Sequence, residues 1–372
     1  MIIWMAAIIP VVTLIYLLVF YRKELVWPEV AALVGIPVII IGIVKVSAEY
    51  SQTRDTEFWG GWVTDTRFYE DWNEYVHRTC TRQNCSGSGD SRTCTTETYD
   101  CSYVHYHPEF WEVNGSNGER VGIGRDRFEF LCKQFDNKVF VDMKRNYHTN
   151  DGDMYMGKWK GEAGRLEPIT SQHTWENRVQ ASRSVFRFPE VKDRSGIYDY
   201  PAISEGYRQQ VVLGATKQLD GVKRMEYWNA VLGARKKVRI YTLLYRNLPL
   251  QKALDQQSLW MGGNKNELNV VVGLDNEDRV QWAHVFSWSE IEGLKVEAKN
   301  YVIGQSTFSL VGFADWLGPE VNKRWVKKNF HDFDYLRVDP PLWAVILAFI
   351  LSLISSGIAA CVSVTNSKRS NQ

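Results

Sequence analysis

The sequence carries almost no excess of charge of either sign, with 44 Lys and Arg residues against 43 Asp and Glu residues. Proteins that bind nucleic acid usually show a basic excess or a basic patch, so this balance argues against a nucleic-acid partner. Aromatic residues are not scarce, because the 372 residues include 15 Trp, 18 Tyr and 16 Phe. Disordered chains contain few aromatic residues, and we therefore expect a folded protein.

Charge is missing altogether from three stretches, residues 2–20, 30–44 and 342–363. A helix needs about 20 apolar residues to cross the roughly 30 Å hydrocarbon core of a bilayer. The first and third stretches reach this length unaided. The second reaches it when its flanks are included, with Glu29 and Lys45 near its two ends. The sequence therefore predicts three transmembrane helices, with a buried core helix as the alternative for the second stretch.

The positions of basic residues predict an orientation, because short cytoplasmic loops are enriched in Lys and Arg. Arg22 and Lys23 separate the first two helices, and Lys368 and Arg369 follow the third. Both sites are placed in the cytoplasm, so the N-terminus and residues 48–340 are predicted to be extracytoplasmic and the C-terminus cytoplasmic. The first stretch lacks a basic leader and a clear cleavage site, so we expect it to be retained.

Cysteines are few, and four of the six lie between residues 80 and 101. Cys80 and Cys101, like Cys85 and Cys94, lie almost symmetrically about turn-forming residues at 86–91. The flanking residues suit strands, so the spacing predicts a β-hairpin with disulfides Cys80–Cys101 and Cys85–Cys94, typical of an oxidising compartment. The alternative is a zinc ion held by the four thiolates, although the close C-x2-C pairs usual for such sites are missing. No other cofactor is expected.

Changes in composition predict an α+β protein built from several parts. These are two transmembrane helices with a short loop at 1–47, a β-rich module with the cysteine hairpin at 48–145, a loop-rich connector at 146–206, an α/β module at 207–340, a transmembrane helix at 341–364 and a cytoplasmic tail at 365–372. In the α/β module, periodicity predicts one helix that ends at Gly233. Ser289 and Glu292 predict a capping box that opens another. Helices alternate with apolar strands, which indicates three layers around a mostly buried sheet.

One stretch of the α/β module resembles a known family. Residues 238–273, which begin with VRIY and end with WMGGNKNELNVVVG, are similar to the TPM domain family. The resemblance implies an α/β sandwich of a kind that is often exported and tethered to a membrane, with some members described as phosphatases. No matching set of acidic metal ligands is present, so the resemblance assigns no catalytic residue.

The chain as a whole also resembles an uncharacterised group of membrane proteins of bacteriophages and bacteria. The similar segments are TCTR at 79–82, YDCSYVHYHPEFW at 99–111 and NRVQASRSVF at 177–186. This resemblance implies a membrane location, and it implies no particular activity.

Familiar catalytic motifs are absent, since the chain has neither G-x-S-x-G nor H-E-x-x-H. Asp275, Glu277 and Asp278 form an acidic turn that, with Asn264, is a candidate pocket or cation site at strand ends. A solvated hairpin turn explains the same residues. The NDGD sequence at 150–153 resembles part of a calcium loop but lacks most ligand positions, which favours an ordinary turn.

We therefore expect a membrane-anchored protein whose large extracytoplasmic domain binds a partner at the membrane or envelope. Its expected partners are the lipid bilayer and an unknown protein, with no nucleic acid. The alternative is a membrane-tethered hydrolase of phosphatase type, which rests on the TPM resemblance. Membrane transport is disfavoured, because no charged residue lies in the middle of a predicted span to form a path.

Overall fold

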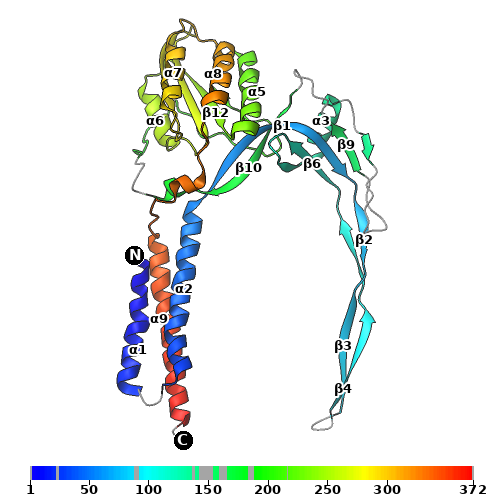
Figure 1. Ribbon diagram of the computed structural model, residues 1–372, viewed down its shortest axis with the longest axis vertical. Coiled ribbons are helices and arrows are strands. Elements are labelled where there is room, and N and C mark those ends of the chain that lie inside the picture. The colour runs from blue at the N-terminus through cyan, green and yellow to red at the C-terminus, as the bar shows by residue number, and fades with distance from the viewer. Residues whose placement is uncertain are drawn as a thin grey trace. The chain divides into compact units, whose positions relative to one another are not determined.

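The computed structural model folds into two compact units (Figure 1). The described residues are 2–21, 25–87, 92–135, 139–141, 154–158, 166–182, 188–215 and 217–370. The helical unit comprises Met1–Glu57, Thr174–Glu190 and Lys328–Gln372, and the main unit comprises Phe58–His173 and Val191–Lys327. Arg22 and Lys23, which carried part of the orientation prediction, and the NDGD turn lie outside the described residues.

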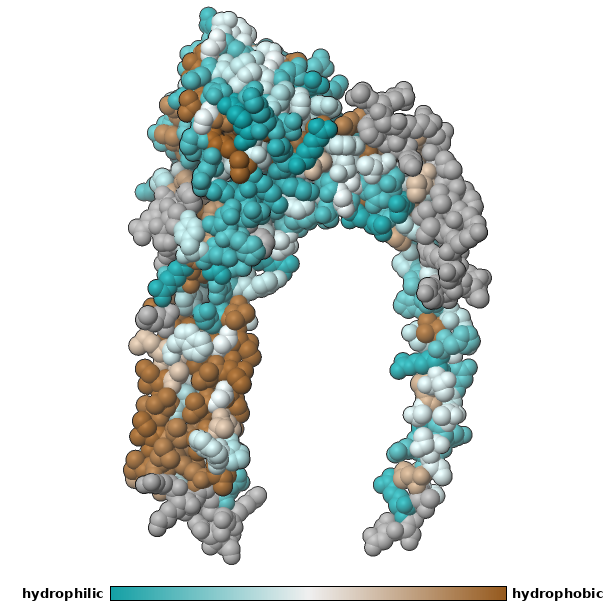
Figure 2. Space-filling view, in the orientation of Figure 1, coloured by the Kyte–Doolittle hydropathy of each residue, from teal (hydrophilic) through white to brown (hydrophobic). Residues whose placement is uncertain are grey.

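The helical unit contains three helices that are long and apolar enough to cross a membrane. Its elements are η1 (Ile2–Ala7), α1 (Ile8–Tyr21), α2 (Trp27–Thr53), the short α4 (Arg178–Ala181), η3 (Phe330–Phe333) and α9 (Leu342–Ser370). The candidate spans are 20, 27 and 25 residues long, at Ile2–Tyr21, Trp27–Thr53 and Leu342–Asn366. Helix α2 thus continues through Glu29 and Lys45, and apolar residues gather over the bundle (Figure 2).

Small residues on α9 bring the helices together. Every fourth residue on one face of α9 is small and buried: Ala344, Ala348, Ser352 and Ser356. This face packs on η1 and α2, and the Ser352 hydroxyl donates to the Ala6 carbonyl at 2.9 Å. Small side chains allow close helix packing where no hydrophobic force acts between helices in lipid. The large apolar side chains are left to face outward, as expected of a bundle surrounded by lipid.

The first sheet of the main unit has the strand order β7-β6-β1-β9-β8, and β10 also pairs with β1. Its strands are β1 (Arg54–Tyr69), β6 (Phe110–Gly115), β7 (Arg120–Ile123), β8 (Val139–Val141), β9 (Met154–Lys158) and β10 (Pro168–Glu176). Helix α3 (Arg125–Gln134) covers it with Phe128 and Leu131, which are fully buried. A tight turn joins β6 to β7, with Gly118 in the left-handed conformation at φ 87°.

Four further strands form a two-stranded ribbon, which we call the arm. They are β2 (Trp72–Val76), β3 (Thr79–Ser86), β4 (Thr93–Asp100) and β5 (Tyr103–His107). Strand β2 pairs with β5 and β3 pairs with β4, both antiparallel. The cysteine hairpin predicted from the spacing is therefore present.

The second sheet of the main unit has the order β11-β12-β13-β14, in which the first three strands are parallel and β14 is antiparallel. Its elements are β11 (Val212–Leu213), α5 (Leu219–Lys236), β12 (Arg239–Arg246), α6 (Gln251–Leu259), β13 (Glu267–Leu274), β14 (Val280–Phe286), α7 (Glu292–Ile303) and α8 (Leu310–Arg324). Helices α5, α7 and α8 share one core with the sheet, and α6 contributes to a separate core. Residues of β12 alternate between the two cores, so the sheet is buried on both faces, as predicted.

The division into parts differs from the predicted one. The predicted modules at 48–145 and 207–340 lie for the most part in the same compact unit. The predicted loop-rich connector at 146–206 also supplies β9 and β10, which both pair with β1. The apolar alternation of these strands is weak in sequence, and pairing with a long strand far away in the chain compensates for it.

Two local predictions are corrected by the structure. Helix α5 does not end at Gly233 but continues to Lys236, and Lys237 adopts the left-handed conformation at φ 55°. Ser289 does not cap α7, which begins after Ile291; its hydroxyl donates to the Val326 carbonyl at 2.8 Å. In both cases a tertiary contact replaces the local role that the residue type favours.

Candidate functional site

The structure separates Asn264 from the acidic turn with which it was grouped. Asn264 precedes the first residue of β13, and Asp275, Glu277 and Asp278 follow its last residue. Eight residues of strand at about 3.3 Å each place the two groups on the order of 25 Å apart. These residues therefore do not line one pocket.

The three carboxylates of the acidic turn are all paired with arginines. The Arg279 guanidinium donates to Asp275 at 2.6 Å and to Glu277 at 3.1 Å, and Asp278 forms an ion pair with Arg246. Burial raises the pKa of Asp275, but hydrogen bonds from the Arg279 backbone and side chain outweigh it and lower the pKa overall. Within the described part of the chain, no three His, Cys, Asp or Glu side chains are grouped as metal ligands would be.

At the other end of β13, Asn264 belongs to a buried polar cluster. The side-chain oxygen of Asn264 accepts from the backbone N–H of Lys265. The backbone N–H of Asn264 donates to the Glu267 carboxylate at 3.0 Å. The Tyr200 hydroxyl donates to the same carboxylate. Burial raises the pKa of Tyr200 well above its ordinary value and that of Tyr241 to about 12. Both phenols are therefore protonated at neutral pH, and they act as hydrogen-bonding groups of the core.

A serine, a histidine and a carboxylate meet at β10, but they do not form a catalytic triad. The Ser171 hydroxyl lies 3.3 Å from Nε2 of His173, and Glu119 lies 3.8 Å from the same nitrogen. In a triad the carboxylate holds the other ring nitrogen. Ser171 is also buried, with 2% of its surface exposed. This cluster has the wrong geometry for nucleophilic catalysis.

His284 of β14 makes the stability of the main unit depend on pH. Burial lowers its pKa below the ordinary 6.5, with a further contribution from Lys299, and its ring contacts Gln257 at 2.7 Å. The unfolded chain therefore binds this proton more readily than the folded protein does. The contribution of His284 to the free energy of unfolding is fully present above pH 6.5 and is lost as the pH falls below it. We expect His284→Gln to melt at a temperature that changes less than wild type between pH 7.5 and pH 5, by near-UV circular dichroism. Equal changes in both proteins would contradict this assignment.

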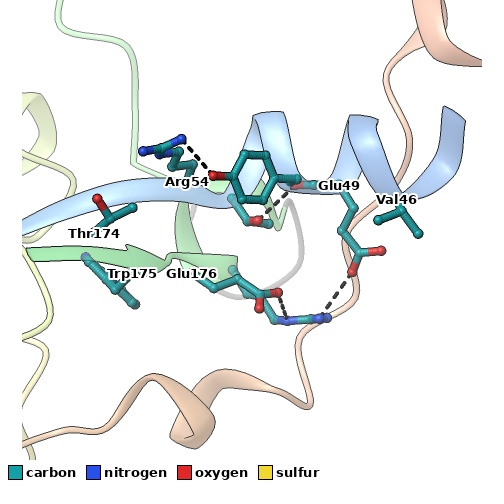
Figure 3. A pocket seen from close by; sticks show the side chains of 9 residues that line it. Val46, Glu49, Arg54, Thr174, Trp175 and Glu176 are labelled. Atoms are coloured by element: carbon teal, nitrogen blue, oxygen red, sulfur yellow. Dashed lines mark hydrogen bonds and ion pairs between the residues drawn. The ribbon is translucent and has the colours of Figure 1, made fainter. Parts of the chain in front are cut away.

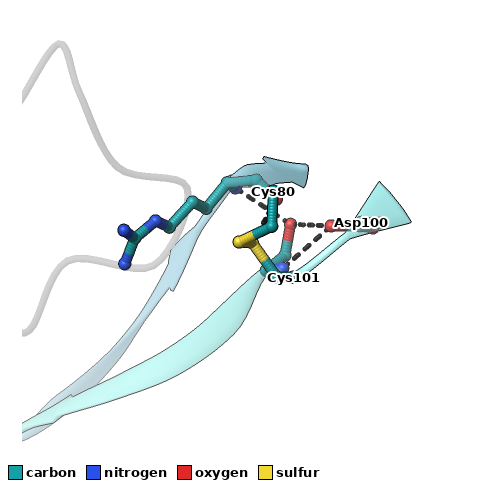
Figure 4. Close-up of a disulfide and its surroundings, with 5 residues drawn as sticks. Cys80, Asp100 and Cys101 are labelled. Carbon is teal, nitrogen blue, oxygen red and sulfur yellow. Dashed lines mark hydrogen bonds between the residues drawn. A yellow bond between two sulfur atoms is a disulfide. The ribbon is translucent and has the colours of Figure 1, made fainter. Parts of the chain in front are cut away.

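Two disulfides close the arm. They link Cys80 to Cys101, with Cα atoms 5.8 Å apart, and Cys85 to Cys94, with Cα atoms 4.0 Å apart. Cys85 and Cys94 are register partners, whereas Cys101 lies one residue beyond β4, which accounts for the offset in spacing. Beside the first disulfide, the Asp100 carboxylate accepts from the backbone of Ser102 at 2.8 Å (Figure 4). The four sulfurs are thus paired with one another, and zinc binding would require both bonds to be reduced.

Aromatic side chains lie exposed on both faces of the arm. Tyr103 shares a face with Trp72, whereas Tyr75 and Tyr106 lie on the opposite face, by the strand register. Exposed fractions of apolar arm residues are near one half: Tyr75 52%, Tyr99 50%, Tyr103 48%, Val104 61% and Tyr106 55%. Neither face is buried by another described part of the chain. Exposed apolar patches of this kind mark interaction sites more often than isolated exposed residues do.

A pocket of about 470 Å³ lies in the helical unit at the C-terminal end of α2. It is lined by Val46, Glu49, Tyr50, Thr53, Arg54, Thr174, Trp175, Glu176 and Arg178. Figure 3 shows Arg54 at one side of the pocket and Glu176 at another. The volume falls in the range of about 300–1,000 Å³ that is usual for ligand sites.

Asn177 places the arginine of this pocket. It is buried, its backbone N–H donates to the Thr53 carbonyl, and its side chain donates to Asp55. Its side-chain oxygen also caps α4 by accepting from Gln180. Because Asn177 connects the end of α2 to the start of α4, the next residue, Arg178, lies next to the end of α2.

Arg178 then joins three separate segments. Its guanidinium contacts Glu176 at 2.8 Å and Glu49 at 3.2 Å, and it donates to the Leu336 carbonyl at 3.3 Å. The sequence prediction missed this site. Arg178 lies within the NRVQASRSVF segment, but nothing local in the sequence pairs it with residue 49 or residue 336.

Comparison of the chain with models of protein families, with curated proteins and with solved structures found no match. The structure by itself defines a mixed helix and strand protein with three candidate membrane spans and two disulfides.

Proposed function

We propose that this protein is a membrane-anchored binding protein whose arm is the surface that docks a protein partner. The observation that supports this function is the exposure of tyrosines on both faces of the arm. Tyrosine and tryptophan are enriched in protein interfaces, where they contribute much of the binding energy. A two-stranded ribbon exposed on both faces is marginal alone in water, so the disulfides support its shape in the absence of the partner.

The proposed location follows the same orientation as the sequence prediction. The three candidate spans anchor the chain in a membrane, and the main unit with the arm is extracytoplasmic, with the C-terminus in the cytoplasm. The disulfides support this location, because they persist in oxidising compartments outside the cytosol. Residues 207–340 are proposed to be a TPM-like module, which their buried three-layer arrangement supports. Membership of the group of phage and bacterial membrane proteins also stays a proposal.

The alternative, a membrane-tethered phosphatase-type hydrolase, gains no support from the placement of its candidate residues. Such an enzyme needs acidic or nucleophilic groups that converge on one reacting atom. The Asp275 carboxylate of the acidic turn forms an ion pair with Arg279, and Asn264 lies at the other end of β13. The binding function is therefore the better supported of the two.

The test is a partner capture with the full-length protein in native membranes. Tyr75→Ser combined with Tyr106→Ser removes one aromatic face of the arm, and we expect capture of the partner to fall roughly tenfold or more, as for interface hot spots. Val296→Ser on α7, where Val296 is 55% exposed, removes a comparable apolar side chain elsewhere in the main unit and is expected to change nothing. Undiminished capture by the double variant would contradict docking on the arm.

A further inference from the structure

We propose that the pocket at the end of α2 binds the headgroup of a membrane phospholipid that carries a primary amine, a phosphatidylethanolamine. This site is separate from the arm and does not depend on the partner-binding function. Three observations support it: an apolar stripe that leads to the pocket, charges of both signs around the pocket, and its place at the end of a candidate membrane span.

An unpacked apolar stripe of α2 runs directly into the pocket. The stripe consists of large apolar residues three or four apart, which lie on one face of a helix: Ile36, Ile39, Ile43 and Val46. Their exposed fractions are 49%, 63%, 61% and 65%, so no other described helix covers them. Val46 and the next member of the spacing, Tyr50, line the pocket. A lipid whose acyl chain lies along this stripe therefore carries its headgroup into the pocket.

The pocket also lies where a headgroup would be. The charge-free part of α2 ends at Val44, shortly before Glu49, and the Leu336 carbonyl that Arg178 contacts precedes the first residue of α9 by six positions. The pocket is therefore next to the ends of two candidate spans at once. Exposed aromatic residues, Tyr50, Tyr335 and Trp343, lie on the same segments. Such residues concentrate at the membrane–water interface.

One side of the pocket offers a cation for the phosphate. Arg54 donates to the Tyr50 hydroxyl at 2.7 Å, and its guanidinium lies 5.4 Å from the centre of that ring. It forms no ion pair with a carboxylate of the described residues, and it is exposed. Arg54 lines the pocket, and a guanidinium with N–H groups left over can donate to phosphate oxygens.

Another side offers carboxylates for an amine. Glu176 contacts Arg178 through one oxygen, and 41% of its side chain is exposed. A carboxylate has about four acceptor positions, so this contact leaves room for an ammonium donor. The Glu49 carboxylate, shared by Arg178 and Lys45, adds negative charge nearby. A primary ammonium donates three hydrogen bonds to such groups, and a choline headgroup donates none. A headgroup with phosphate but no amine would bring like charge to Glu49 and Glu176.

The experiment measures which lipid stays bound to the purified full-length protein in detergent, by native mass spectrometry. Dioleoyl phosphatidylethanolamine, phosphatidylcholine and phosphatidylglycerol are added at equal concentrations. We expect phosphatidylethanolamine to be retained roughly fivefold more than either of the others, a difference typical of one or two charge-assisted hydrogen bonds. Soluble phosphoethanolamine, added at the same concentration, is expected not to displace it, because it lacks the acyl chains that lie on the stripe.

Variants then assign the preference to the pocket. Glu176→Gln is expected to reduce the preference to near parity, because it removes the carboxylate that accepts from the amine. Arg54→Gln is expected instead to lower the retention of all three lipids, because all three carry the phosphate, and Arg54→Lys to restore part of that retention. Arg337→Gln is the matched control, because Arg337 is exposed at the same end of the bundle and does not line the pocket. Thermal melting shows whether each variant is folded.

Four results would overturn the proposal. They are equal retention of the three lipids, preference for phosphatidylglycerol or phosphatidylcholine, a preference that survives Glu176→Gln together with retention that survives Arg54→Gln in folded protein, and displacement by soluble phosphoethanolamine. The last would identify a free small molecule rather than a lipid as the ligand.

Discussion

Gly60→Val is expected to lower the melting temperature of the main unit by roughly 6–12 °C. At this position β1 crosses α5 with backbone against backbone. A Cβ atom at Gly60 would lie 2.4 Å from the carbonyl oxygen of Asn229, and one at Gly233 would lie 2.5 Å from the carbonyl oxygen of Gly60. Backbone atoms cannot rotate away as a side chain would, so the strand and the helix must separate.

The size of the effect follows from what else depends on this crossing. The Asn229 side chain donates to the Ile240 carbonyl at 3.0 Å and accepts from the Ile240 N–H at 2.8 Å, which ties α5 to β12. The Lys237 ammonium lies 3.9 Å from the centre of the Trp59 ring on β1. Overpacking alone costs typically 1–3 kcal/mol. With these contacts strained, about 3 kcal/mol is expected, at roughly 2–4 °C per kcal/mol for a domain of this size.

The measurement is near-UV circular dichroism of the full-length protein in detergent during heating. Gly122→Val is the matched control, since Gly122 lies in β7 of the same sheet and a Cβ there meets no atom within 4 Å. Valine suits an exposed strand position, so the control should melt at or slightly above the wild-type temperature. If both variants melt alike, β1 and α5 do not make this close crossing.

The sequence could predict features that depend on neighbours along the chain. The three candidate spans follow from missing charge, and the disulfide pairs follow from spacing about a turn. The β12 and β13 strands follow from short runs rich in apolar residues, because a sheet covered on both faces needs no polar alternation. In each case a short window of residues contains the physical cause of the structure.

Features that depend on distant contacts could not be predicted in this way. The sequence pattern predicts a helix end at Gly233. In the structure its missing side chain instead lets the backbone of Gly60 lie against the helix. In the sequence Arg178 looks like any other basic residue. Its ion pair with Glu49 exists only because the fold places the two residues side by side. The acidic turn at 275–278 shows the converse, because residues with a suggestive composition are paired with Arg246 and Arg279. Composition therefore could not show that the fold pairs these carboxylates with arginines.

Reduction of the two disulfides is expected to unfold the arm and leave the rest of the main unit folded. Both faces of the arm are exposed, so little apolar burial stabilises it. The disulfides close segments with sequence separations of 21 and 9 residues. Cross-links of this size contribute about 3 kcal/mol each by loop-closure entropy, which is large for so small an element. Local unfolding should then occur without global unfolding.

Limited proteolysis with mass mapping measures this effect. We expect dithiothreitol, or Cys80→Ser combined with Cys85→Ser, to make residues 72–107 cleavable while the melting temperature of the remainder changes little. Strong chelators are the matched control and should leave cleavage unchanged. If chelators expose the arm and dithiothreitol does not, the four sulfurs hold a zinc ion and the disulfide assignment is wrong.

The same cysteines test on which side of the membrane the arm lies. On intact cells, a membrane-impermeant reductant followed by an impermeant maleimide should label Cys80, Cys85, Cys94 and Cys101, and the maleimide alone should not. Labelling without reductant would mean that the thiols are free in the cell. Labelling only after permeabilisation would mean that the arm faces the cytoplasm. A reducing cytoplasm would keep these cysteines as thiols, so in that case the arm would lose the cross-links that hold its tyrosines in a defined surface for a partner.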